Sequence, residues 1–71
     1  MHIEIKLGEV NVMCEFTVFL DNEIVFRDAT YAKAEANRVL LRDVLGKSKT
    51  IEHCKVAEVD VASQRLILAK A

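Results

Sequence analysis

Cys14 is the residue of this chain whose side chain is best suited to bind a metal ion. A thiolate is a soft ligand and a nucleophile, and one thiolate per chain becomes half of a two-sulfur site when two chains meet at a two-fold axis. In a strand, Cys14 would share its face with alternate apolar residues, and it could then be a small buried hydrophobic side chain. Those residues are Val10, Val12, Phe16, Val18 and Leu20. The residue type alone leaves both interpretations open.

The other soft or imidazole donors are Cys54, His53 and His2. Adjacent residues in a strand point to opposite faces, so His53 and Cys54 cannot easily serve one site. We predict that Cys54 lies in the core and that His53 lies on the surface. His2 could bind a metal through its imidazole and nearby terminal nitrogens, but its alternation with charged residues predicts a solvated side chain.

Nothing in the sequence indicates an enzyme. The carboxylates have no spacing that would place two of them in one pocket; they include Glu15, Asp28, Asp43 and Asp60. The sequence has no Ser-His-Asp arrangement, no Gly-rich phosphate loop and no pair of Cys-x-x-Cys motifs. We therefore expect a protein without catalytic activity.

Length and composition predict one small domain that associates with itself. The chain has 71 residues, of which 52% are hydrophobic. A domain of this size has little core, and dimerisation is one remedy when no disulfide framework exists. The start of the chain does not have the pattern of a signal peptide, which predicts a cytoplasmic protein. Two cysteines in a cytosolic chain are expected to be free thiols or metal ligands. No apolar run is long enough to span a membrane.

The charge balance argues against strong binding to nucleic acid. Ten basic and eleven acidic residues give a net charge of −1. A sequence-independent grip on phosphates needs a surplus of Lys and Arg. A weak or local contact with RNA is compatible with this balance.

The strands that must position Cys14 form a hairpin over residues 13–28. Two β-rich runs flank Asp21-Asn22-Glu23, and Asn tolerates the left-handed conformation that such turns need. Before the hairpin, Ile3, Ile5 and Leu7 alternate with polar residues and predict a short strand.

Residues 29–45 are compatible with two structures. Thr30 could cap a helix and Gly46 could follow its end, and helix propensity favours this α+β alternative. The alternation of Ala32, Ala34 and Ala36 with polar residues fits a strand instead. On the residues alone we favour the helix. Beyond it, we expect residues 51–61 to be extended with a bulge near 57–58, residues 62–64 to turn, and residues 65–69 to form a closing strand.

From Met13 onward the chain resembles the CooT family of small nickel-binding proteins. Members open with Met-Cys, then have a hairpin, an Asp-x-x-Gly turn, a strand of the pattern hydrophobic-x-x-hydrophobic-Asp-hydrophobic, and a final aliphatic strand. Here these motifs are Met13-Cys14, residues 15–28, Asp43-Val44-Leu45-Gly46, residues 56–61 and Leu66-Ile67-Leu68.

The resemblance implies an all-β fold, a small antiparallel sheet or partly open SH3-like barrel over residues 13–71, with residues 1–12 as an additional strand. It replaces the helix by a strand, a turn at Asn37 and a second strand. It also implies a homodimer that holds one nickel ion through Cys14, and a link to carbon monoxide dehydrogenase as a possible client enzyme. The family has also been labelled as predicted RNA-binding, so a metal-free β-barrel binding module is the alternative function.

The position of Cys14 in the mature chain affects its donor set. If translation begins at Met1, the residue offers a thiolate and backbone amide nitrogens. If it begins at Met13, processing can leave an amino-terminal cysteine, whose amine and thiolate chelate square-planar nickel.

Overall fold

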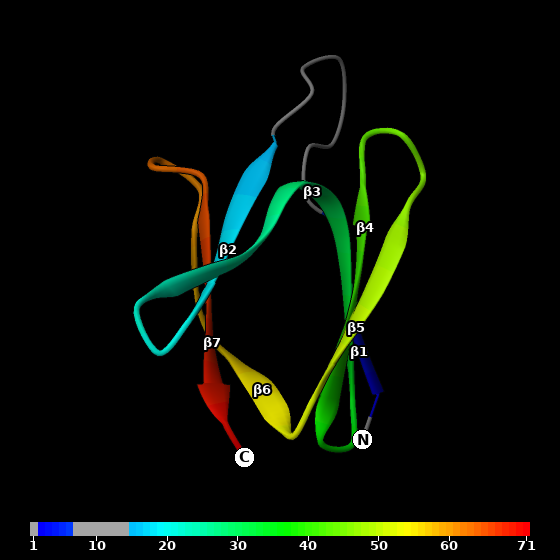
Figure 1. Cartoon of the computed structure of the whole chain (residues 1–71), viewed down its shortest axis with the longest axis vertical. Coiled ribbons are helices and arrows are strands. Elements are labelled where there is room, and N and C mark those ends of the chain that lie inside the picture. The colour runs from blue at the N-terminus through cyan, green and yellow to red at the C-terminus, as the bar shows by residue number, and fades with distance from the viewer. Residues whose placement is uncertain (1, 7–14) are drawn as a thin grey trace.

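A computed structural model of the chain describes residues 2–6 and 15–71 (Figure 1). This part of the chain contains strands and turns and no helix, so it holds no helix that could cross a membrane. The all-β prediction is confirmed, and the α+β alternative with a helix near residues 30–45 is wrong. The strands are β1 (His2–Lys6), β2 (Phe16–Leu20), β3 (Glu23–Glu35), β4 (Arg38–Asp43), β5 (Ser48–Glu52), β6 (Cys54–Asp60) and β7 (Arg65–Lys70).

These strands form one mixed sheet that curls on itself without closing. The strand order is β5-β4-β3-β2-β7-β6, and β1 pairs with β3 beside this path. Strands β2 and β7 are parallel, whereas the other paired strands are antiparallel. The two end strands, β5 and β6, follow each other in the chain and diverge from a shared corner (Figure 1). The architecture is therefore that of a partly open barrel.

Strand β3 is long and bent, and it joins the two halves of the sheet. Its pairing register shifts twice against β2 and once against β4. Asp28 lies within this bent region and has a positive φ of 58°. Bulges of this kind bend a strand and increase its twist. As a result the first half of β3 pairs with β2, and its second half pairs with both β1 and β4.

The residues that were expected to be helical are held as strands by pairing on both sides. Ala32 is opposite Ile5 on one edge of β3 and opposite Leu41 on the other. Its side chain is fully buried. The chain then reverses through a turn at residues 36–37, where Ala36 has a φ of 52°. Pairing and burial over this stretch outweigh the helix propensity of its alanines, which is a weak local preference.

The other turns follow the sequence expectations. Asp21 and Asn22 both have positive φ, 53° and 65°, as a type I′ hairpin turn requires. The register of β6 against β7 shifts between Val56 and Glu58, which confirms the bulge near residue 57. Residues 61–64 form a turn before β7.

The core lies on the concave side of the sheet. Within the described residues no polar or charged side chain is buried. The buried side chains come from five strands and are Phe16, Val18, Ala29, Ala32, Val39, Leu41, Cys54, Leu66 and Leu68. The inward phase predicted for β2 is thus confirmed at Phe16 and Val18.

Candidate metal centre

Cys14, the predicted metal ligand, lies outside the described residues. It precedes Phe16, the first residue of β2, by two positions. Two residues of chain span at most about 7 Å, so covalent geometry alone keeps the two Cα atoms within that distance. Any site that includes Cys14 must therefore lie close to the residues around the start of β2.

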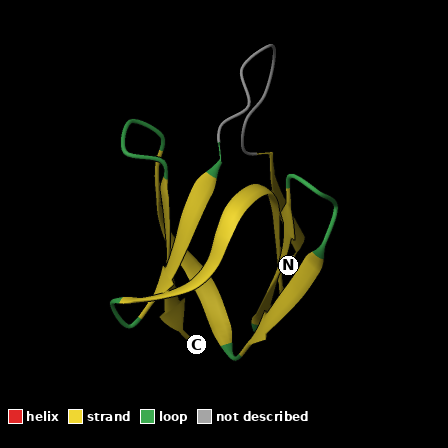
Figure 2. Cartoon of the chain, turned by 45° about the horizontal axis from the view of Figure 1, so that its top comes forward, coloured by secondary structure: helices red, strands yellow, loops and turns green. Residues whose placement is uncertain are grey.

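The start of β2 lies between two turns at one end of the sheet (Figure 2). On one side, the Thr17 N–H donates to the Gln64 carbonyl at 3.0 Å, which ties β2 to the turn between β6 and β7. On the other side, Phe16 pairs with Ala29 of β3. Next to that pair, the Val44 N–H donates to the Asp28 carbonyl at 3.1 Å. Segments far apart in the sequence thus converge on the chain just after Cys14.

Two carboxylates at this end of the sheet stabilise turns. Asp43 Oδ1 accepts hydrogen bonds from the backbone N–H groups of Leu45 and Lys47, both at 2.9 Å. Gly46 in the same turn has a φ of 87°. This is the structural role of the Asp-x-x-Gly motif, because the side chain satisfies two turn donors and the glycine adopts the left-handed conformation.

Asp60 plays a similar part in the turn between β6 and β7. Its Oδ1 accepts a hydrogen bond from the Ser63 N–H at 3.2 Å, and its Oδ2 lies 3.8 Å from the Arg65 guanidinium. Hydrogen bonds from the Ser63 side chain and backbone hold the pKa of the Asp60 carboxyl below its usual range. The carboxylates of Glu15 and Asp28 are exposed and stabilise no such turn.

Cys54 belongs to the core, as predicted. Its side chain is fully buried and its Sγ donates a hydrogen bond to the Ile51 carbonyl at 3.2 Å. Burial raises the pKa of this thiol, so it stays protonated near neutral pH. Metal binding requires the thiolate. Cys54 is therefore a poor ligand in the folded protein.

His53 is exposed, also as predicted, and forms the corner between β5 and β6 with a φ of 55°. Two backbone hydrogen bonds fix this corner. The Cys54 N–H donates to the Asn37 carbonyl at 2.9 Å, and the Ala71 N–H donates to the His53 carbonyl at 3.0 Å. The histidine is thus exposed, whereas the thiol beside it is buried.

The described residues do not form a metal site by themselves. Within residues 4–5 and 15–71, no three or more His, Cys, Asp or Glu side chains come together to hold an ion. The side chain of His2 lies outside this part of the chain. A metal centre in this protein consequently needs donors from outside this part of the chain or from a second chain.

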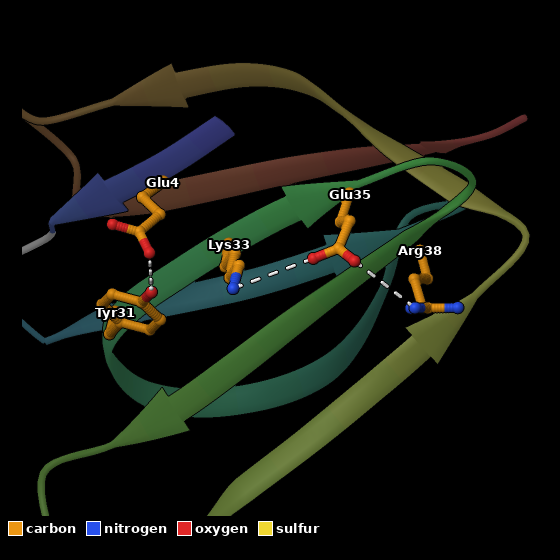
Figure 3. Close-up of polar contacts among 5 residues, drawn as sticks. All are labelled: Glu4, Tyr31, Lys33, Glu35 and Arg38. Carbon is orange, nitrogen blue, oxygen red and sulfur yellow. Dashed lines mark hydrogen bonds and ion pairs between the residues drawn. The ribbon is translucent and has the colours of Figure 1, made fainter. Parts of the chain in front are cut away.

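A polar network that the sequence analysis did not anticipate covers the outer face of β1, β3 and β4 (Figure 3). The Tyr31 hydroxyl donates to Glu4 Oε1 at 3.0 Å, and the Arg42 guanidinium lies 4.6 Å from the centre of the Tyr31 ring. Burial and the Glu4 carboxylate raise the pKa of Tyr31. Only the alternation of β3 hinted at this network, because it places residues 31, 33 and 35 on the outer face.

Further along β3, Glu35 lies between two basic side chains. Its carboxylate is 3.8 Å from Lys33 Nζ and 3.5 Å from an Arg38 guanidinium nitrogen (Figure 3). On this face the basic side chains of Lys33 and Arg38 are thus paired with a carboxylate. A phosphate-binding surface would instead present a surplus of positive charge.

The fold and the candidate site define a small, partly open β protein whose second thiol, Cys54, is sealed in the core. The family model of the CO dehydrogenase accessory protein CooT matches residues 13–69, and the chain belongs to this family. The match begins at the Met13-Cys14 pair. Comparisons with curated proteins and with solved structures found no significant match.

Proposed function

We propose that this CooT-family protein is a nickel-binding accessory protein or metal carrier for carbon monoxide dehydrogenase. In this proposal it acts as a homodimer in the cytoplasm, where thiols stay reduced, and it carries out no catalysis itself. One nickel ion is held between the Cys14 thiolates of two copies. The observation that carries the proposal is the family match from Met13 onward, together with the burial of the other cysteine, Cys54.

The donor set supports nickel over zinc. Two thiolates and two backbone amide or amine nitrogens, one of each from either copy, make a planar four-ligand set. This geometry suits Ni(II) or Cu(II) better than tetrahedral Zn(II). Copper would bind more tightly to the same donors, so nickel must be selected by its supply or by the client enzyme.

A titration with Ni²⁺ tests the proposal. We expect thiolate-to-nickel charge-transfer absorption that saturates at one metal per two chains. Cys14→Ser should abolish this band. Cys54→Ser is the matched control, because its hydroxyl can keep the hydrogen bond to the Ile51 carbonyl, and it should leave the band nearly unchanged. Loss of the band in Cys54→Ser with retention in Cys14→Ser would refute the assignment.

Binding should weaken as the pH falls, because both thiols must lose their protons to become ligands. Two protons compete for each metal site, so the affinity should fall steeply as the thiols become protonated. The same titration at several pH values measures this dependence. An affinity that does not change between neutral and mildly acidic pH would exclude thiolate ligands.

The alternative function, a metal-free module that binds RNA, receives no support from the outer face of the sheet. The basic side chains of Lys33, Arg38 and Arg42 each lie beside a carboxylate or a ring within that face. Strong affinity for single-stranded RNA at low salt, retained in Cys14→Ser, would favour this alternative over the nickel carrier.

A further inference from the structure

Strand β5 is the end strand of the sheet that has a regular free edge. It pairs with β4 over five consecutive residues without a register shift. Figures 1 and 2 both show it as one boundary of the sheet. The other end strand, β6, has a bulge between Val56 and Glu58, and a bulge disrupts the ladder that an added strand would need. Of the two end strands, β5 therefore offers the better edge for a further strand.

The backbone groups that point outward from β5 include those of Ser48 and Thr50. The Asp43 N–H donates to the Lys47 carbonyl at 2.8 Å, and hydrogen-bonded pairs alternate with other pairs along an antiparallel ladder. In the observed register the N–H and C=O groups of Lys49 thus face β4, and the residues on either side of it turn theirs away. Within residues 2–6 and 15–71, no strand pairs with these outward groups. Unpaired groups in a row form a template for another strand.

The concave side of β5 presents a lysine next to an apolar residue. Lys49 is opposite the buried Leu41 and shares its face, and Ile51 on the same face packs against the core. Lys49 is exposed, and its Nζ donates to the Val25 carbonyl at 3.3 Å. An ammonium group has three donors, so this lysine can also bind a carboxylate. Neither Lys49 nor Lys47 forms an ion pair with another described residue.

We propose that β5 binds an extended, acidic segment of a partner protein by adding it to the sheet as an antiparallel strand. The segment presents an apolar residue to Ile51, followed at alternate positions by acidic residues that face Lys49 and Lys47. Its backbone pairs with the outward groups of Ser48 and Thr50. In this mode of recognition the main chain supplies affinity and alternate side chains supply specificity. The inference involves no thiol and no metal ion, so it does not depend on the proposed function.

A second copy of the chain fits this edge less well. Pairing of β5 with itself would place Lys49 opposite Ile51 or opposite the same lysine of the other copy. Like charges directly opposite each other destabilise a sheet, and a lysine on an edge strand is a common protection against such pairing. An acidic segment instead gives each lysine a carboxylate, which accounts for the charge that the partner must carry.

Two synthetic peptides of opposite charge test the proposal. The capped peptide Thr-Ile-Thr-Glu-Thr-Glu-Thr has the proposed pattern, and its control has Lys in place of both Glu residues. The acidic peptide should bind the full chain at least about tenfold more tightly than the control, because two attractive contacts replace two repulsive ones. It should also slow hydrogen exchange at the amides of Ser48 and Thr50. Equal binding of the two peptides, or unchanged exchange at these amides, would overturn the proposal.

Variants of the full chain locate the contact. Thr50→Pro removes an outward N–H without removing a hydrogen bond to β4, so it should abolish binding of the acidic peptide. Thr50→Val is the matched control, because it keeps the N–H and a β-branched side chain, and it should bind like the wild type. Circular dichroism checks that each variant keeps the native sheet. Binding of the acidic peptide to folded Thr50→Pro would refute strand addition at β5.

A charge exchange tests the same contact without a proline. The double variant Lys47→Glu with Lys49→Glu should prefer the basic peptide to the acidic one, the reverse of the wild-type preference. Reversal together with protection of the Ser48 and Thr50 amides supports the proposal. A preference for the acidic peptide that persists in the double variant shows that the peptide binds elsewhere, and it overturns the assignment to β5.

Discussion

The Cys54 thiol donates a hydrogen bond to the Ile51 carbonyl across the corner that joins β5 to β6. The contact spans 3.2 Å and lies beside His53, whose φ of 55° lets the chain change direction. One residue thus fills the core and closes the corner between the two end strands of the sheet. This dual role makes Cys54 a structural residue of the fold.

Replacement of Cys54 by Ala should destabilise the fold by about 1–2 kcal/mol, because the change leaves a small cavity and removes the hydrogen bond. The urea midpoint measures this loss. The pKa of the thiol is raised in the folded state. Its contribution is therefore fully present below the unfolded pKa, about 8.5, and is lost as the pH rises through the higher folded pKa. The variant should lose less stability than the wild type between neutral and strongly basic pH, and an equal loss would contradict this account.

Ala36→Gly should stabilise the protein by about 1 kcal/mol. Ala36 has a φ of 52°, a conformation that strains an L-residue with a Cβ and that glycine adopts freely. Ala62→Gly is the matched control, because this exposed turn residue does not have a positive φ. The control should be destabilised by about 0.4–1 kcal/mol through the greater freedom of its unfolded chain. Thermal unfolding measures both, and shifts of the same sign would argue against strain at Ala36.

Asp43→Ala should destabilise the turn between β4 and β5 by about 1–3 kcal/mol, because two backbone N–H groups lose their acceptor. Asp43→Asn keeps a carbonyl oxygen at the same place and should retain most of the stability. Hydrogen exchange at the amides of Leu45 and Lys47 reports this loss directly. Unchanged protection of these amides in Asp43→Ala would show that the side chain is not their acceptor.

Stability should depend on Asp60 at acidic pH. The pKa of its carboxyl is lowered by the hydrogen bonds from Ser63. Its contribution is therefore present above the unfolded pKa, about 3.9, and is lost as the pH falls through the lower folded pKa. Asp60→Asn removes this titration, so its unfolding free energy should decline less steeply than that of the wild type below about pH 4. Parallel acid unfolding curves for the two proteins would contradict the role of Asp60.

Local rules were enough to predict several features of this protein from its sequence. The period of two places Phe16 and Val18 inward, and it separates Cys54 from His53. The turn at Asp21-Asn22 follows from the conformations that these residue types tolerate. The order of short motifs also indicated the family that matches residues 13–69. Each of these features depends on neighbours within a few residues or on an ordered pattern along the chain.

Tertiary contacts alone determined the rest. Residues 29–35 have the propensity of a helix but form a strand, because β1 and β4 pair with them from either side. The parallel pairing of β2 with β7 joins Thr17 to Arg65, and no local pattern encodes such a contact. The placement of the exposed residues Leu45 and Val61, on turns on either side of the start of β2, likewise depends on how distant segments converge. The sequence indicated a donor at Cys14, whereas the folded sheet determined which residues surround the strand that follows it.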